Sequence, residues 1–167
     1  MPVAFIGLGA NLGERLSQLR AAASALNAVP HTTVLGVSRI YETPPWGMPH
    51  QPPFLNAVAS IQTALEPLAL LQQLKSIERR LGRPEHYERW SARLIDLDIL
   101  LYDDLVIDEP TLTIPHPALP FRKFALVPLL ELANPIHPLA KKPISALLSE
   151  TLDSSDIVPT DYTLLCC

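Results

Sequence analysis

The chain has 167 residues, of which 48% are hydrophobic and 18% charged, and its formal net charge is −4. This length suffices for one domain that buries a core without metals or disulfides, and the composition excludes an intrinsically disordered chain. The negative charge disfavours general binding to nucleic acids or anionic membranes, and no apolar run approaches the roughly 20 residues of a membrane helix. We therefore expect one cytoplasmic domain, residues 1–167, without nucleic-acid or membrane partners.

The first part of the chain predicts a strand, a helix and two further strands. Residues 3–8 form a short β-prone run, and apolar residues at steps of three and four predict an amphipathic helix over 12–26. A second β-rich segment covers 33–41. Five prolines follow in the ten residues 44–53 and restrict the shapes of that loop. The next strand, 54–62, alternates between two faces of different character.

The second part predicts another helix, a strand and two shorter helices. The helix begins near Pro67, where a first turn tolerates proline, and Gly82 ends it. The strand 94–102 follows. A helix is predicted over 124–132, with Pro128 interrupting its start, and a weaker one over 145–151.

The order β-α-β-β-α-β predicts an α+β protein of the split βαβ type, with both helices on one face of an antiparallel sheet. In the strand 94–102, the apolar odd-numbered residues from Ile95 to Leu101 would face the helices. Asp96 and Asp98 would then lie on the opposite face, which we expect the C-terminal segment and the proline-rich loop to enclose.

The glycine-rich stretch GLGANLGE, Gly7–Glu14, does not fit a dinucleotide-binding fingerprint. Its spacing is G-x-G-x-x-x-G, and no acidic residue occurs between Glu14 and Glu42. Asn11 and Glu14 instead predict a capping box at the start of the first helix. Gly9 would still allow a ligand to approach the backbone closely.

Asp96 and Asp98 are the strongest candidates for metal binding. Side chains at i and i+2 of a strand lie about 6 to 7 Å apart on one face, so the two carboxylates can converge on one cation. Mg²⁺ is the natural choice, since it binds carboxylates together with substrate phosphates. A solvated surface pair is the structural alternative, but Leu94 and Leu100 on the same face favour partial enclosure.

An arginine cluster precedes the acidic strand. Arg79 and Arg80 are expected to be surface charges at a helix end. Arg83, Arg89 and Arg93 lie in the segment that leads to the acids, and guanidinium groups match phosphate oxygens. Metal ligands beside arginines indicate phosphoryl chemistry.

Aromatic residues suggest a slot for a flat heterocycle. Phe54 and Asn56 share the sheet face of the acids, and Trp46 lies on the proline-rich loop; Asn56 could recognise the edge of a ring. Most of the five histidines are expected to be incidental. His116, between two prolines, is a candidate for a phosphate contact that its spacing alone does not establish.

Taken in order, these motifs resemble the 6-hydroxymethyl-7,8-dihydropterin pyrophosphokinase family of folate biosynthesis. The resemblance runs from about residue 3 to residue 132. It rests on GANLG at 9–13, YETPPWG at 41–47, FLNA at 54–57, IE at 77–78, RW at 89–90, RLIDLDIL at 93–100, and LTIPHP followed by RKF between 112 and 124.

The resemblance implies a ferredoxin-like monomer that transfers pyrophosphate from the co-substrate ATP to the pterin hydroxymethyl group and releases AMP. Asp96 and Asp98 would hold two Mg²⁺ ions and act in catalysis with Arg83 and Arg93, Arg83 coming from a loop that closes. The ATP site would comprise Lys75, Glu78, Arg89, Trp90, Arg93, Ile99, Leu112, Thr113, His116 and Arg122. The pterin site would comprise Gly9, Thr43, Pro44, Trp46, Phe54, Asn56 and Phe124, with the ring stacked between the two phenylalanines.

Several positions depart from the family pattern. Ser91-Ala92 replaces the usual Gly-Pro, and Lys75 replaces a common glutamine. Glu85 and Thr111 stand where some members have arginine. We expect an active enzyme with altered kinetics.

Two other classes of function stay open at this point. A non-catalytic ferredoxin-like module could bind RNA by stacking bases on the sheet, although two carboxylates would repel the phosphate backbone without Mg²⁺. A metal-dependent phosphohydrolase would turn over ATP without pterin.

Overall fold

The computed structural model describes residues 1–10, 14–43, 53–82 and 95–164. The strands in this part of the chain are β1 (Val3–Ala10), β2 (Thr32–Val37), β3 (Tyr41–Thr43), β4 (Phe54–Thr63), β5 (Asp96–Tyr102), β6 (Ile107–Glu109), β7 (Leu112–Ile114) and β8 (Val158–Pro159). The helices are α1 (Arg15–Asn27), α2 (Pro67–Arg80), the 3₁₀ helix η1 (Leu119–Phe121), α3 (Lys123–Leu132) and α4 (Ile144–Glu150).

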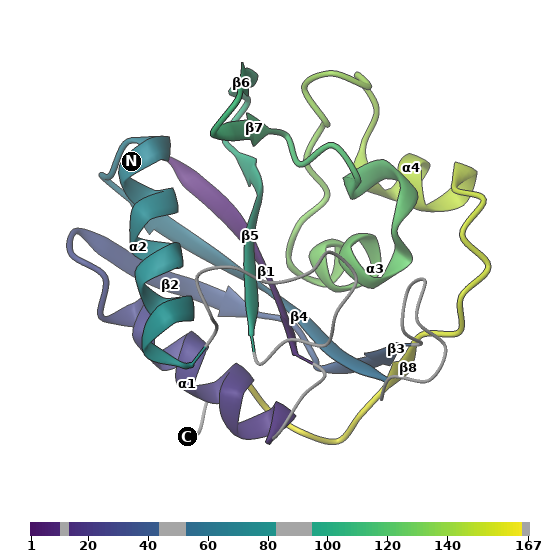
Figure 1. The fold of residues 1–167 in the computed structure, drawn as a ribbon. Helices are drawn as coiled ribbons and strands as arrows, with labels where there is room; N and C mark the ends of the chain where they lie inside the picture. The colour runs from purple at the N-terminus through teal and green to yellow at the C-terminus, as the bar shows by residue number, and fades with distance from the viewer. Residues whose placement is uncertain (11–13, 44–52, 83–94, 165–167) are drawn as a thin grey trace.

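The main sheet confirms the predicted split βαβ topology. Its strand order is β5-β1-β4-β3-β8, with β2 paired to β4 beside β3, and every pairing is antiparallel. Helices α1 and α2 lie on one side of this sheet, and α3 and α4 lie on the other (Figure 1). The hairpin β6–β7 forms a separate two-stranded sheet. None of the described helices is long and apolar enough to cross a membrane.

The face of the sheet under α1 and α2 carries a continuous apolar core. The predicted alternation of β4 is confirmed, because every second residue from Leu55 to Ile61 is buried in this core. Helix α2 contributes Leu70, Leu74 and Ile77, each fully buried. It runs from Pro67 at its first position, as predicted.

Strand β5 differs from the prediction near its C-terminal end. Its pairing with β1 is interrupted between Phe5 and Ile6, which face Leu101 and Ile99, so Leu100 is the extra residue of a β-bulge. The bulge reverses the alternation beyond it. Leu101 therefore packs on the α3 side and Tyr102 on the helix side, so the expectation that Leu101 faces α1 and α2 was wrong.

The opposite face of the sheet is covered only in part. Side chains of α3 and α4 pack on Phe5, Val58 and Leu100 to form a second apolar cluster. Asp96 and Asp98 lie on this same face, nearer the end of the sheet where β5 begins. The sequence predicted that the C-terminal segment would enclose this face, and α3 and α4 cover the part around Phe5, Val58 and Leu100.

The β segment predicted at 33–41 is divided into β2 and β3. Ser38 still pairs with β4, because its N–H donates to the carbonyl of Val58. The N–H of the next residue, Arg39, points away from the sheet. It donates to the carboxylate of Glu131 on α3, at 3.2 and 3.3 Å from the two oxygens. A contact distant in the sequence thus interrupts the strand.

The capping-box prediction for α1 was wrong. The helix begins at Arg15, so Glu14 occupies the cap position instead of the first turn, and its side chain makes no capping hydrogen bond. Asn11 lies outside the described residues. Pro128 lies inside α3 and is buried there, not at the start of the helix.

Candidate active site

A row of four residues crosses the sheet at the end where β5 begins. The register pairs Asp96 with Gly9, Gly9 with Asn56, and Asn56 with Tyr41. Because neighbouring strands lie about 4.8 Å apart, Asp96 and Asn56 are separated by about 10 Å, with only a glycine between them. The carboxylate pair and the amide therefore flank a strip of bare backbone.

The two carboxylates on β5 are partly exposed and affect each other. Burial, followed by the negative charges of Asp96 and Glu78, raises the pKa of Asp98 from 3.8 to about 7. Lys75 and Arg122 oppose this effect. Burial and the two neighbouring carboxylates thus disfavour the charged form of Asp98, and a divalent cation bound there would favour it.

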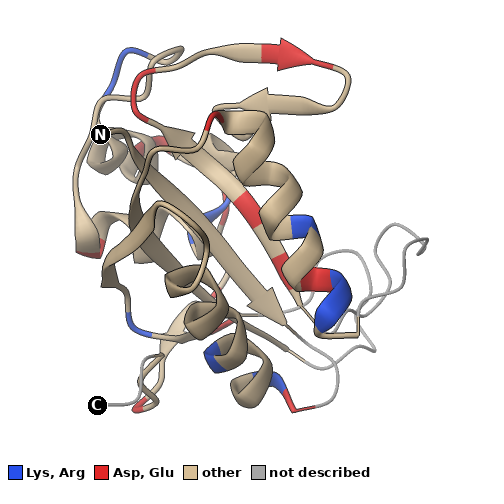
Figure 2. Ribbon diagram, turned by 90° about the vertical axis from the view of Figure 1, so that its left-hand side faces the viewer, with Lys and Arg blue, Asp and Glu red and all other residues tan. Residues whose placement is uncertain are grey.

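Glu78 ties helix α2 to the edge of β5 between the two acids. Its side chain is 2% exposed, and Oε2 accepts a hydrogen bond of 2.8 Å from the backbone N–H of Leu97. The ammonium of Lys75 lies 3.5 Å from Oε1. In Figure 2 the charged end of α2 lies beside the acidic segments of β5. Glu78 therefore fixes the backbone that connects Asp96 to Asp98.

The segment that follows β7 also packs against the edge strand β5. The N–H of His116 donates to the carbonyl of Leu100 at 3.0 Å, and Nδ1 of His116 accepts from the N–H of Ala118 at 3.1 Å. Burial and the charge of Arg122 lower the pKa of His116, while Asp96 raises it. His116 is therefore largely neutral at pH 7, with its proton on Nε2.

Asn56 is held by its neighbour on β3 and lies over Gly9. The Nδ2 group of Asn56 donates to the hydroxyl of Thr43 at 2.7 Å, and both side chains are buried. A Cβ at Gly9 would come within 2.8 Å of Oδ1 of Asn56. Position 9 therefore has no room for a side chain, because Asn56 occupies that space.

The two phenylalanines of the predicted slot come from different layers. Phe54 is the first residue of β4, paired with Thr43, and Phe124 lies in the first turn of α3. Both side chains are partly exposed. The guanidinium carbon of Arg122 lies 5.4 Å from the centre of the Phe124 ring, a cation–π distance. Arg122 thereby connects the aromatic wall with the acidic edge.

Some predicted site residues have buried side chains. Ile99 and Leu112 are 4% and 9% exposed and belong to the core beneath α1 and α2, so only their main chain can contact a ligand on the other face. Thr113 is partly exposed on β7. Arg79 and Arg80 are exposed, as predicted.

The remaining predicted residues lie outside the described part of the chain. These are Pro44, Trp46, Arg83, Arg89, Trp90 and Arg93, together with Leu94 and the departures Glu85, Ser91 and Ala92.

The residue pattern did not predict that Glu78 is buried. The sequence pointed to this position only through the family resemblance. A signal was present. Glu78 follows Leu70 and Leu74 at steps of four on the buried stripe of α2, and an acid on such a stripe needs a buried partner. The partner is a strand N–H, which no local pattern specifies.

An antiparallel split βαβ sheet, with two helices on one face and a carboxylate pair on the other, defines a ferredoxin-like α+β protein with a polar site on its sheet face. The match of a family model extends this to a particular family. Residues 5–134 match the model of 7,8-dihydro-6-hydroxymethylpterin-pyrophosphokinase (HPPK), and the chain belongs to this family.

Curated relatives agree with the family match. The chain is 40% identical over 151 residues to the 2-amino-4-hydroxy-6-hydroxymethyldihydropteridine pyrophosphokinase of Aquifex aeolicus, covering 90% of this chain and 92% of that protein. It is 43% identical over 134 residues to the Haemophilus influenzae protein of the same name, covering 80% and 83%. The folic acid synthesis protein fol1 of Schizosaccharomyces pombe is 40% identical, but the match covers only 20% of its length.

Solved structures support the fold. The Plasmodium falciparum HPPK-DHPS with STZ-DHP superposes with a TM-score of 0.71 at 15% identity, covering 89% of this chain and 45% of that one. An HPPK-DHPS in complex with substrates gives a TM-score of 0.68, with 89% and 43% covered. The chain thus spans less than half the length of these two structures.

Proposed function

We propose that this protein transfers pyrophosphate from ATP to the hydroxymethyl group of 6-hydroxymethyl-7,8-dihydropterin and releases AMP, a step of folate biosynthesis. The observation that carries the proposal is the row Asp96–Gly9–Asn56. Together with Asp98, two residues further along β5, it presents two carboxylates and an amide on one face, separated by bare backbone. The names of the relatives and the family match support the same reaction.

The residues present fit Mg²⁺ as the metal. Asp96 and Asp98 offer hard oxygen ligands, and burial, with the charges of Asp96 and Glu78, disfavours the ionised form of Asp98 in a way that a bound cation would offset. We infer that substrate phosphates and water would complete the coordination, as is usual for Mg²⁺. We infer two ions, which when bound would lower the proton affinity of the attacking hydroxyl and neutralise charge on the phosphates.

The protein groups would orient the two substrates for in-line displacement. The pterin oxygen forms a bond to the β-phosphorus while the bond from that phosphorus to the oxygen of the α-phosphate breaks, and AMP leaves with that oxygen. Arg122 and Lys75 would offset charge on the phosphates, and neutral His116 would donate from Nε2 to a phosphate oxygen. No side-chain nucleophile is required.

The pterin would lie over the strip at Gly9. Asn56 would recognise the ring edge with Oδ1, its orientation fixed by the hydroxyl of Thr43. Phe54 and Phe124 would stack on the ring from opposite sides. We infer that Pro44 and Trp46 complete this slot and that Arg83, Arg89, Trp90 and Arg93 complete the ATP site with Glu78, Thr113 and the main chain at Ile99 and Leu112.

We also infer that the protein acts as a monomer and as one domain, residues 1–167. In support, the free edge of β5 is covered by Glu78 and His116 of the same chain, which blocks strand pairing with another molecule.

The test is mass detection of products after mixing the protein with MgATP and 6-hydroxymethyl-7,8-dihydropterin. The proposal predicts AMP and a pterin carrying two additional phosphates, in equal amounts. AMP without pterin, or ADP as the nucleotide product, would instead indicate a phosphohydrolase or a simple kinase. Asp96→Asn should abolish both products, whereas Asp108→Asn, an exposed acid on β6, should not.

A further inference from the structure

Helix α3 begins at the turn that carries Arg122 and Phe124, yet it is not capped from within. Arg122 occupies the cap position with an extended backbone, φ −130° and ψ 107°, and its side chain makes no capping hydrogen bond. The first helical N–H, that of Lys123, donates instead to Oδ2 of Asp153 at 2.9 Å. The cap comes from a residue 30 positions later in the chain, beyond the region matched by the family model.

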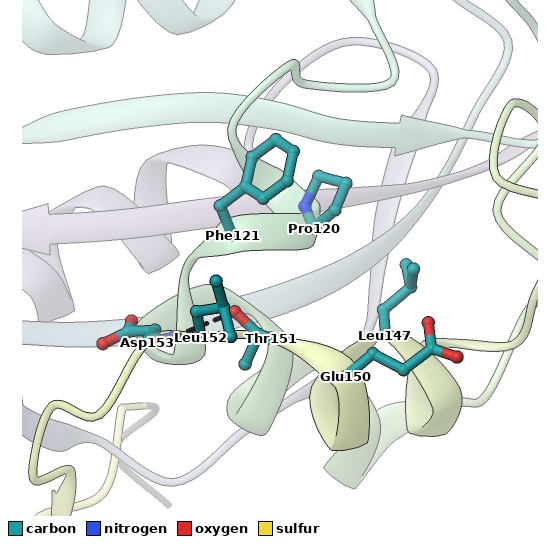
Figure 3. A pocket seen from close by; sticks show the side chains of 7 residues that line it. All are labelled: Pro120, Phe121, Leu147, Glu150, Thr151, Leu152 and Asp153. Atoms are coloured by element: carbon teal, nitrogen blue, oxygen red, sulfur yellow. Dashed lines mark hydrogen bonds between the residues drawn. The ribbon is translucent and has the colours of Figure 1, made fainter.

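The carboxylate of Asp153 is itself fixed on its other side. Oδ1 accepts a hydrogen bond of 2.9 Å from the N–H of Ser155 and another from its hydroxyl. The N–H of Asp153 donates to the hydroxyl of Thr151 at 3.3 Å, the contact drawn in Figure 3. Burial alone would raise the pKa of Asp153, but the hydrogen bonds from Ser155 and from the N–H of Lys123, with the charge of Lys123, lower it, so the group is ionised at neutral pH. A rigid anion therefore lies against the N-terminus of α3, where negative charge is favoured.

On the side that faces α4, the turn at Arg122 is supported by the hydrogen bond from the N–H of Lys123 to Asp153. A pocket of about 520 Å³ lies beside this turn, between η1 and α4. Pro120 and Phe121 line it above, and Leu147 and Leu152 line it below (Figure 3). Phe121 is 66% exposed and Leu152 is 99% exposed, so these two side chains add little packing between the turn and the C-terminal segment, while Leu119 anchors η1 in the second apolar cluster. The hydrogen bond from Lys123 to Asp153 joins the turn to the C-terminal segment at this point.

The same C-terminal segment also supports the opposite wall of the site. Strand β8 pairs with β3, and the N–H and hydroxyl of Thr160 both donate to the carbonyl of Ile40 at 2.9 Å. Leu164, near the end of the described residues, is 1% exposed in the core under α1 and α2. Before Asp153, α4 is anchored by Ile144 and Leu147 in the second apolar cluster. The segment is thus held on both sides of Asp153, which allows this residue to act as a fixed point.

We propose that Asp153 is a positioning residue for the reaction: by fixing the N–H of Lys123 it sets where Arg122 and Phe124 lie over the substrate face of the sheet. The inference rests on the proposed function, because it gives Phe124 the pterin ring and Arg122 the phosphates as ligands. Asp153 touches neither substrate and acts through the backbone of α3.

The test compares Asp153→Ala with a helix cap elsewhere on the same layer. Asn134 caps α4 in the same way, since its Oδ1 accepts from the N–H of Ser145 at 2.9 Å and its Nδ2 donates to the hydroxyl of Ser145 at 3.0 Å. Asn134→Ala therefore removes a similar cap without touching the turn at Arg122. Asp156→Ala, an exposed acid in the same segment, controls for charge.

Asp153→Ala should raise the KM for pterin about tenfold, the value of one well-placed aromatic contact, and change kcat much less. Both controls should leave this KM unchanged, even where Asn134→Ala lowers Tm as much as Asp153→Ala does. Asp153→Asn, which keeps one acceptor oxygen, should give an intermediate KM and serves in place of Asp153→Ala if that variant does not fold. Equal KM values in the Asp153 and Asn134 variants would overturn the proposal and leave Asp153 a structural cap.

Failure of the proposed function would be recognised separately. If the wild-type protein forms no pyrophosphorylated pterin, the inference is judged by calorimetric binding of MgATP alone. Asp153→Ala should then weaken MgATP binding through Arg122 while Asn134→Ala does not. Unchanged MgATP binding would overturn the inference in that case as well.

Discussion

The two faces of the sheet are built from the same strands and differ in almost every physical property. Under α1 and α2, the inward side chains of β1, β4 and β5 are almost all apolar and form one continuous core that includes Ile6, Ala59 and Ile99. On the opposite face the apolar cluster under α3 ends at Leu100, and beyond it come two acids, two glycines and an amide.

The difference shows how stability and chemistry are separated within one strand. Leu97 is 1% exposed, whereas Asp96 and Asp98 on either side of it are partly exposed. Alternation with period two places residues one position apart on opposite faces. Neighbouring substitutions in β5 should therefore damage different properties of the protein.

The largest effect is expected on the polar face. Asp96→Ala or Asp98→Ala should lower turnover by about a thousandfold or more, because each removes a ligand whose metal supplies several kcal/mol to the transition state. Unfolding by urea should show no loss of stability, since neither substitution removes atoms from an apolar core. Steady-state AMP release with saturating MgATP and pterin is the measurement. Turnover within tenfold of wild type in either variant would contradict the metal assignment.

The next effect is expected on the apolar face of the same strand. Leu97→Ala should lower the free energy of unfolding by about 3 kcal/mol, the typical loss for a buried leucine and its cavity. Its backbone N–H still donates to Glu78, so the acids keep their support and kcat of the folded fraction should stay close to wild type. Urea denaturation and an active-site titration separate the two quantities. A thousandfold loss of kcat in this variant would mean that the faces are not independent.

The sequence predicts the regular parts of this comparison well. Alternation in β4, the apolar steps of three and four in α2 and the punctuation by Pro67 and Gly82 are local signals, and Gly82 does adopt a positive φ of 98°. The acid pair on the free face also follows from local alternation. The features that the sequence pattern does not predict depend on residues far away in the chain.

Three particular features illustrate that limit. The bulge at Leu100 depends on the register with β1, and the break between β2 and β3 depends on Glu131 on α3. The cap of α3 depends on Asp153. Each satisfies a backbone N–H or accommodates a neighbouring layer, and none of these partners lies within a sequence window that local propensity describes.

A smaller effect should distinguish the two glycines on the polar face of β1. A Cβ at Gly9 would lie 2.8 Å from Oδ1 of Asn56, whereas a Cβ at Gly7 would make ordinary contacts of 3.5 Å with Leu100. Gly9→Ala should therefore displace Asn56 and raise the KM for pterin by about tenfold to a hundredfold, as expected for a small misplacement of a substrate-positioning group. Gly7→Ala should change this KM by less than about threefold, because ordinary van der Waals contact costs little. Similar KM values in the two variants would argue against the pterin position over Gly9.

The smallest effect concerns the stability cost of the polar face and its dependence on pH. Because the pKa of Asp98 is raised from 3.8 to about 7, the folded protein holds this proton more tightly than the unfolded chain. Its contribution to stability is present below pH 4 and is lost as the pH rises from 4 to 7. Removing the charge in Asp98→Asn should therefore stabilise the protein at pH 8 but not at pH 4.

The gain at pH 8 should be about 1 kcal/mol, since solvent, Lys75 and Arg122 screen part of the repulsion at this partly exposed group. Mg²⁺ should produce the opposite pattern. It binds the ionised carboxylates, so it should raise the Tm of the wild type more at pH 8 than at pH 5 and have little effect on Asp98→Asn. Thermal unfolding of both proteins at the two pH values, with Mg²⁺ and with EDTA, measures each difference. A wild type that gains as much from Mg²⁺ at pH 5 as at pH 8 would show that its metal is bound away from Asp98.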